Sequence, residues 1–193
     1  MADEIWRELK KEAQQVIQQE PLLASYVYAC VLNHDSLESA LSFILATKLS
    51  DDVMPVVTVR ELFDNALAES PEMVTNAAYD IKAVFTRDPS ICTYLQVILH
   101  LKGFQSIQVH RLANFLWKND RADLARFIQS RNSEVFSVDI HPACVMGRGI
   151  MFDHATGIVI GETSVVEDNV SILQGVTLGG TGNEQGDRHP KIR

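Results

Sequence analysis

An aspartate and a histidine fifteen residues apart, Asp139 and His154, form the pair in this chain best suited to acid–base chemistry. The repeat described below indicates a coil of roughly 18 residues per turn, which brings the two side chains close on stacked coils. A carboxylate that accepts an imidazole N–H fixes the tautomer and raises the basicity of the other ring nitrogen. Such a pair can remove the proton of an alcohol. The alternative is two polar residues on a solvated corner of the coil.

A second candidate lies in the glycine-rich segment 179–190, which reads as a loop. Arg188 suits a carboxylate, which it can bind through two parallel N–H donors, and His189 can donate or accept a hydrogen bond. Loops of this kind often carry binding residues, although a flexible surface loop is the alternative. The glycines are too irregular for a nucleotide-binding fingerprint, and no strand–loop–helix context supports a phosphate loop.

Three histidines of the second half also allow a metal interpretation. A zinc hydratase built on a trimeric β-helix could use His141, His154 and His189 as ligands. The nearby Asp139 and Arg188 fit substrate binding better, so we expect no metal.

The spacing of the remaining histidines and of the cysteines indicates neither a metal site nor a catalytic site. We expect the three other histidines to be structural or solvated, namely His34, His100 and His110. The odd number of cysteines, without metal-type spacing, predicts small buried apolar residues in a reducing cytosol: Cys30, Cys92 and Cys144.

The second half has a six-residue period. Aliphatic or aromatic residues recur six apart in two runs, Ile140, Met146, Phe152 and then Ile160, Val166, Ile172, Leu178. A six-residue register predicts a parallel β-helix, because a meander would alternate with period two. The single spacing of eight, from Phe152 to Ile160, predicts a two-residue insertion around 157–159, beside His154.

Composition changes near residue 138. Nine of the ten glycines follow it, whereas the first part reads as several helices. Ser36 or Asp35 is expected to cap one helix, and Thr58 with Glu61 a second through a capping box. We therefore predict two domains, an α-helical one over 1–138 and a β-helical one over 139–193.

Charge and hydropathy exclude several classes of protein. The 17 basic and 25 acidic residues give a formal charge of −8, which argues against nucleic acid as the main partner. No apolar run approaches the roughly 18 residues of a membrane span, and the acidic N-terminus resembles no secretory signal. We expect a cytoplasmic protein without a membrane partner.

The coils also end abruptly. A solenoid needs a cap on its open end, but Arg193 follows shortly after a glycine-rich loop. We therefore expect the β-helix to be incomplete at the C-terminus and the chain to be a piece of a longer protein.

Several motifs together resemble bacterial serine O-acetyltransferases of the hexapeptide-repeat acyltransferase superfamily. The resemblance covers nearly the whole chain and rests on Arg87–Pro89, Asp139–Ala143, Gly147–Gly149, Phe152–Gly157, Ile160–Thr163, Gly175–Thr181 and Asp187–Ile192. It implies an α+β fold, with an N-terminal α-helical oligomerisation domain over 1–138 followed by a left-handed parallel β-helix over 139–193, which is the catalytic domain and is present only in part.

The resemblance further implies transfer of the acetyl group of acetyl-CoA to the hydroxyl of L-serine, the first step of cysteine biosynthesis. His154 would be the general base and Asp139 its orienting partner. Arg188 would bind the substrate carboxylate, with His189 beside it. The substrate ammonium would be bound by Asp88 and Asp153. Acetyl-CoA would be a co-substrate and no cofactor would be permanently bound.

Family members are hexamers, each a dimer of trimers, with active sites between adjacent coils. L-cysteine commonly inhibits them, and a C-terminal tail, absent from this sequence, docks into cysteine synthase. Because later coils are also absent, we expect much of the acetyl-CoA site to be missing. The alternative function is a catalytically weak or inactive oligomerisation module.

Overall fold

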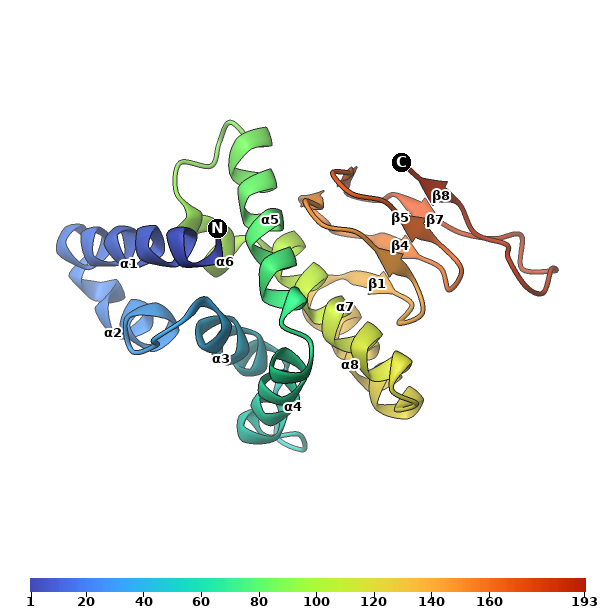
Figure 1. Ribbon diagram of the computed structural model, residues 1–193, viewed down its shortest axis with the longest axis horizontal. Helices are drawn as coiled ribbons and strands as arrows, with labels where there is room; N and C mark the ends of the chain where they lie inside the picture. The colour runs from blue at the N-terminus through green and yellow to red at the C-terminus, as the bar shows by residue number, and fades with distance from the viewer. The chain divides into compact units, whose positions relative to one another are not determined.

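The computed structural model describes residues 1–193 and divides into two compact units, Met1–Leu101 and Lys102–Arg193. Figure 1 shows helices throughout the first unit and short strands at the end of the second. The change of composition near residue 138 coincides with the first strand, but the division between the units comes earlier. The reason is that the helices over 102–136 pack against the strands. The predicted division into functional domains at 138/139 stays a prediction.

The first unit is entirely helical. Its elements are α1 (Ala2–Gln19), η1 (Pro21–Leu23), α2 (Ala24–Val27), η2 (Tyr28–Leu32), α3 (Leu37–Leu49), α4 (Val56–Glu69), α5 (Glu72–Arg87) and α6 (Tyr94–His100). The buried carboxylate of Glu12 on α1 accepts the backbone N–H groups of Tyr94 and Leu95, which satisfies the start of α6. Burial raises the pKa of Glu12, and these two hydrogen bonds oppose that rise.

Helix ends in this unit test the predicted caps. Ser36 precedes α3, and its hydroxyl accepts the N–H of Ser39 at 3.2 Å, so this cap is confirmed. The capping box at Thr58 is wrong, because α4 begins earlier, after Pro55, whose carbonyl accepts the N–H of Thr58. The prediction that all three cysteines are buried is wrong for Cys92, which is exposed in the segment between α5 and α6.

The second unit begins with two helices joined by a short turn, α7 (Lys102–Lys118) and α8 (Ala122–Phe136), which pack closely on each other. Eight short strands follow: β1 (Val138–Ile140), β2 (Val145–Met146), β3 (Met151–Asp153), β4 (Ile158–Ile160), β5 (Val165–Val166), β6 (Ser171–Leu173), β7 (Thr177–Leu178) and β8 (Lys191–Ile192). They form three parallel sheets, in the orders β1-β4-β7, β2-β5-β8 and β3-β6. The predicted parallel β-helix is confirmed, and Figure 1 shows β1, β4 and β7 side by side.

Strand register measures the length of each coil. Val138 pairs with Ile158, twenty residues later, whereas Val159 pairs with Thr177, eighteen residues later. The two extra residues therefore lie in the first coil, at the corner between β3 and β4. The predicted hexad positions are buried, with Met146 the half-buried exception.

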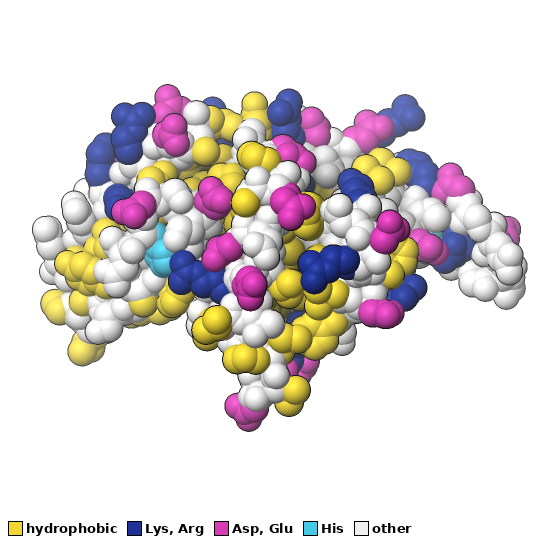
Figure 2. All heavy atoms as spheres, turned by 60° about the horizontal axis from the view of Figure 1, so that its bottom comes forward, with side chains coloured by type: hydrophobic (Ala, Val, Ile, Leu, Met, Phe, Trp, Pro, Cys, Tyr) yellow, Lys and Arg dark blue, Asp and Glu magenta, His cyan; other side chains and the backbone are white.

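The loop after β7 lengthens the third coil. Val165 on β5 pairs with Lys191 on β8, twenty-six residues later, so residues 179–190 form an enlarged corner between β7 and β8, which lie in different sheets. The predicted loop is confirmed. None of the helices combines the length and the apolarity that crossing a membrane requires. Figure 2 shows acidic and basic side chains interspersed over the face that it draws.

We predict that His110 on α7 makes unfolding pH-dependent. Its ring is buried, Nε2 lies 3.2 Å from the Cys144 carbonyl oxygen, and burial lowers its pKa to about 3. In the unfolded chain a histidine titrates near pH 6.5, so between about pH 6.5 and 3 only the unfolded state gains this proton. Native stability therefore falls as the pH falls through this window, by about 1.4 kcal/mol per pH unit.

The measurement is the free energy of unfolding by urea at several pH values. His110→Gln keeps a donor for the Cys144 carbonyl but does not titrate, so its stability should fall less steeply than that of the wild type. His154→Asn, which replaces a histidine whose side chain is 75% exposed, is the matched control. Parallel pH dependence of the wild type and His110→Gln would contradict the prediction.

Candidate active site

His154 lies at the corner where the first coil is longer. His154 and Ala155 have φ angles of +55° and +63°, and Gly157 follows at +77°. Consecutive left-handed residues other than glycine are uncommon and gather at functional sites. The turn buries Ala155 and leaves the His154 side chain 75% exposed, with Nε2 at 3.7 Å from Asp153 Oδ1. The corner therefore presents an accessible imidazole beside a carboxylate.

Asp139 occupies the middle of β1. Its neighbours Val138 and Ile140 are buried, so the alternation of a strand turns Asp139 away from the coil interior. Its Oδ1 accepts the side-chain N–H of Gln129, on α8, at 2.7 Å. Within this single chain Asp139 therefore binds Gln129, and His154 approaches Asp153. The predicted Asp139–His154 pair stays a prediction.

Arg188 is held by a residue that the sequence did not single out. Its Nη2 donates to Glu162 Oε2 at 2.7 Å, and its Nη1 donates to the carbonyl of Gly186. The hydrogen bond from Arg188 holds the pKa of the Glu162 carboxyl below its usual range. The pair fixes the guanidinium at the base of the 179–190 loop, where it is only partly exposed.

His189 packs next to Arg188, against the β-helix. Its Nδ1 lies 2.8 Å from Thr163 Oγ1 and 3.2 Å from the Thr163 backbone nitrogen. The ring lies over Gly161, where any side chain would overlap it. Thr163 and Glu162 thus anchor the two loop residues that the sequence proposes as substrate contacts.

His141 connects these groups electrostatically. Burial is the largest influence on its pKa and lowers it, while the carboxylates of Glu162 and Asp139 raise it and Arg188 lowers it. Its Nδ1 accepts the N–H of Ala143, and the ring meets Trp117 edge-on at 5.1 Å between centroids. The charges of Asp139, Glu162 and Arg188 therefore all act on this one ring.

The histidines do not converge as metal ligands. The structure brings together no group of three histidine, cysteine, aspartate or glutamate side chains that could hold an ion. Because Nδ1 of His141 and Nδ1 of His189 both accept backbone N–H groups, the zinc alternative receives no support from geometry.

Asp88 belongs to the other compact unit, Met1–Leu101, at the C-terminal end of α5. Its Oδ1 accepts the backbone N–H of Ser90 at 2.9 Å and the Ser90 hydroxyl at 2.6 Å. Its proposed contact with the substrate stays a prediction.

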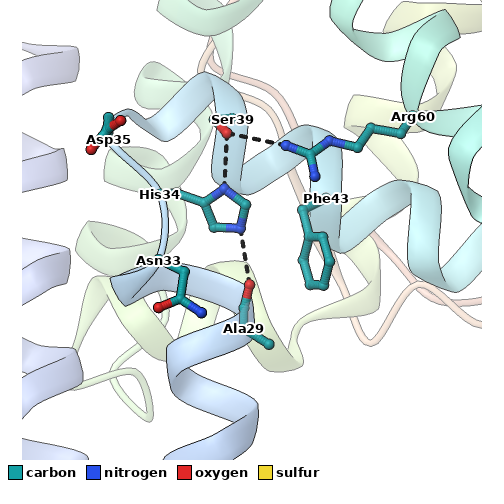
Figure 3. Close-up of a pocket in the computed structure, with 7 residues that line it drawn as sticks. All are labelled: Ala29, Asn33, His34, Asp35, Ser39, Phe43 and Arg60. Carbon is teal, nitrogen blue, oxygen red and sulfur yellow. Dashed lines mark hydrogen bonds between the residues drawn. The ribbon is translucent and has the colours of Figure 1, made fainter.

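A separate pocket of about 340 Å³ lies in the first unit, and Figure 3 shows its polar groups facing one another. The buried His34 ring bonds Ser39 Oγ at 2.8 Å and the Ala29 carbonyl at 2.9 Å, and Arg60 reaches the same Ser39 hydroxyl. The Arg60 guanidinium also lies over the Phe43 ring. Because these groups satisfy one another, His34 is a structural residue, as expected.

Comparison with known proteins links this architecture to one family. The family model "Serine acetyltransferase, N-terminal" matches residues 5–109. The serine acetyltransferase of Salmonella typhimurium is 53% identical over 189 residues, which cover 98% of this chain and 69% of that protein.

Solved structures agree with this likeness. A serine acetyltransferase in complex with cysteine has a TM-score of 0.97 at 49% identity, covering 99% of this chain and 79% of that one. A serine acetyltransferase in complex with CoA has a TM-score of 0.96 at 48% identity, covering 100% and 80%.

Proposed function

The chain belongs to the serine acetyltransferase family, and from this premise we propose how its residues transfer an acetyl group from acetyl-CoA to L-serine. The products are O-acetyl-L-serine and CoA, and the reaction is the first step of cysteine biosynthesis. The observation that carries the assignment of a base is the left-handed corner that holds His154 accessible to solvent.

In the proposed reaction the serine hydroxyl oxygen attacks the thioester carbonyl carbon of acetyl-CoA. His154 takes the hydroxyl proton as the C–O bond forms, because the free alcohol is far too weak an acid to ionise at neutral pH. When the C–S bond breaks, the protonated imidazole returns that proton to the CoA sulfur. No enzyme nucleophile is needed, since the thioester is already activated, and alignment of the two substrates supplies a large part of the acceleration.

The remaining residues hold the amino acid. Arg188, fixed by Glu162, is proposed to bind the substrate carboxylate, since a guanidinium pairs with it through two N–H groups. Asp153, beside His154, is proposed to bind the ammonium group, together with Asp88. His189 is proposed to place the substrate from the loop side. L-cysteine, which differs from serine by one atom, fits the same contacts and inhibits by occupying them.

Assembly follows from the outer faces of the coils. Val145, Val159 and Leu173 are exposed there, and apolar side chains in such positions favour contact with other copies. We propose a cytoplasmic homo-oligomer, a dimer of trimers, with sites completed between neighbouring coils. Docking into cysteine synthase through a C-terminal tail is implied for longer relatives and is assigned to no residue of this chain.

The test is release of CoA from acetyl-CoA in the presence of L-serine, with sedimentation of the same sample. We expect turnover that requires L-serine and is absent with L-alanine, which lacks the hydroxyl. L-cysteine should compete with L-serine. An assembled chain without turnover would instead support the alternative of an inactive oligomerisation module.

Asp139→Asn tests the predicted orienting role. The substituted side chain can still accept the Gln129 N–H through its amide oxygen, so the fold should persist. We expect kcat/KM to fall by about 10-fold to 100-fold, less than on loss of the base. Without the carboxylate the imidazole is no longer fixed in one tautomer and orientation, so the loss should appear in kcat more than in KM.

Asp153→Asn is the matched control, because Asp153 is the carboxylate nearest to His154 in the single chain. A larger loss of kcat in Asp139→Asn than in Asp153→Asn supports the predicted pair. The reverse order would assign the orienting role to Asp153.

A further inference from the structure

Thr163 is the point to which the 179–190 loop is fastened. Its hydroxyl oxygen accepts the backbone N–H groups of Arg188 and His189, both at 3.1 Å. Its carbonyl oxygen accepts the ammonium group of Lys191. One threonine on the second coil thus sets the position of both loop residues that the proposed function places against the substrate.

The same contacts determine where His189 carries its proton. The backbone nitrogen of Thr163 can only donate, and it lies 3.2 Å from His189 Nδ1, so Nδ1 must be an acceptor. The Thr163 hydroxyl already accepts two N–H groups, and its single proton has two acceptors, Nδ1 at 2.8 Å and the Asp187 carboxylate. The backbone N–H of Thr163 therefore fixes Nδ1 as an acceptor, the hydroxyl can add a second donor there, and the proton of the neutral ring resides on Nε2.

Gly161 leaves room for this orientation. A Cβ at this position would overlap His189 at Nε2 and Cδ2 and would lie 2.8 Å from Cε1. The ring therefore packs directly against the backbone of the second coil at Gly161. Nε2–H makes no hydrogen bond within the chain and is the donor that the ring offers to a ligand.

We propose that Thr163 is a positioning residue that holds His189 as the neutral Nε2–H tautomer, so that His189 donates to the substrate carboxylate beside Arg188. The role toward substrate rests on the proposed function, whereas the tautomer does not. His189 then acts as a fixed hydrogen-bond donor and not as a second base. Because one hydroxyl anchors both residues, it also sets the spacing between the guanidinium and the imidazole N–H.

The tautomer is measured by long-range ¹H–¹⁵N correlation on the chain labelled with ¹⁵N-histidine. Only six histidines contribute, and His189→Gln identifies the signal. We expect an unprotonated Nδ1 and a protonated Nε2 at neutral pH. Thr163→Ser keeps the hydroxyl and should keep this pattern. Thr163→Val removes one of the two donors and should give a mixture of tautomers.

Lys191→Met is the matched control for a purely structural role, since it loosens the loop and leaves the Thr163 hydroxyl in place. Its His189 tautomer should be that of the wild type. A proton on Nδ1 in the wild type, or the same spectrum in Thr163→Val as in the wild type, would overturn the proposal. If Thr163→Val does not fold, Gly161→Ala displaces the ring with the hydroxyl intact and tests the same contact.

Binding of L-serine, measured by calorimetry, tests the substrate part. Loss of a hydrogen bond to a charged group should weaken L-serine binding about tenfold in Thr163→Val, with recovery in Thr163→Ser. 2-Amino-1,3-propanediol lacks the carboxylate and cannot form the hydrogen bond to His189. Its binding affinity should therefore differ by less than about twofold between Thr163→Val and the wild type. Equal weakening of both ligands would overturn the assignment to the carboxylate.

The two proposals can fail separately. A wild-type chain that shows the Nε2–H pattern but binds no L-serine would count against the proposed function and the substrate role, and would leave the tautomer established. A wild-type chain that binds and acetylates L-serine with the proton on Nδ1 would overturn the inference alone.

Discussion

Replacement of His154 by asparagine is expected to lower kcat/KM for acetyl transfer by about 10²-fold to 10⁴-fold, the range that a general base contributes. No other imidazole can replace it, because Nδ1 of His141 and Nδ1 of His189 both accept backbone N–H groups on the coils. The substrate hydroxyl then has no base to take its proton as it attacks.

Asparagine is the informative choice because of the backbone. At φ +55° most side chains are strained, and asparagine tolerates the left-handed region better than alanine does. The side chain is 75% exposed, so its truncation removes little packing. Circular dichroism, sedimentation and thermal unfolding should therefore match the wild type, and the loss should be confined to catalysis.

The matched control is His100→Asn, at an exposed position on α6, which should leave kcat/KM unchanged. His154→Ala should lose as much activity as His154→Asn, with slightly lower stability. Near-normal turnover in His154→Asn would remove the general-base role, whereas unfolding of both variants would show that the corner needs the imidazole for its conformation.

The coils were predictable because burial inside a narrow β-helix imposes one apolar residue per side. That constraint produced the six-residue period and located the irregular corner beside His154. Helix ends were less predictable, as Thr58 and Glu61 illustrate. They have the residue types of a capping box, but Pro55 starts α4 one turn earlier, since its fixed φ of −69° suits the position before a helix.

The candidate site was only partly predictable for a similar reason. Arg188 and His189 could be proposed from their types, but their anchors could not. Glu162 and Thr163 lie 26 residues earlier and become neighbours only because β8 returns to pair with β5. The alternating pattern of a strand does not reveal such a register once a long loop interrupts it.

Gly103→Ala is expected to destabilise the second unit by about 3 kcal/mol, the upper part of the range for overpacking. Gly103 lies in the first turn of α7, where the backbone of β3 approaches closely. A Cβ there would overlap the Phe152 carbonyl oxygen and lie 3.0 Å from the Phe152 carbonyl carbon and Cβ. Helix propensity alone predicts the opposite sign, a gain of about 1 kcal/mol, so the measured sign separates the two effects.

Neither α7 nor β3 can move apart at this contact without a loss of stability. Phe152 is 5% exposed and is paired with Ile172 on β6, so a shift of its backbone would break the ladder between coils. The strand continues directly into Asp153 and His154, so any movement that relieves the overlap also displaces the catalytic corner. We therefore expect Gly103→Ala to lower kcat/KM under conditions in which the protein is still folded.

The measurement is urea unfolding followed by circular dichroism, with acetyl transfer measured below the transition. Gly179→Ala is the matched control, since the only atom near its Cβ is the methyl group of the exposed Thr177 side chain, at 3.1 Å, and it should change stability by less than about 0.5 kcal/mol. Unchanged or greater stability in Gly103→Ala would mean that α7 can move away from β3. Helix α7 would then not fix the position of the corner between β3 and β4, and the local left-handed turn alone would position His154.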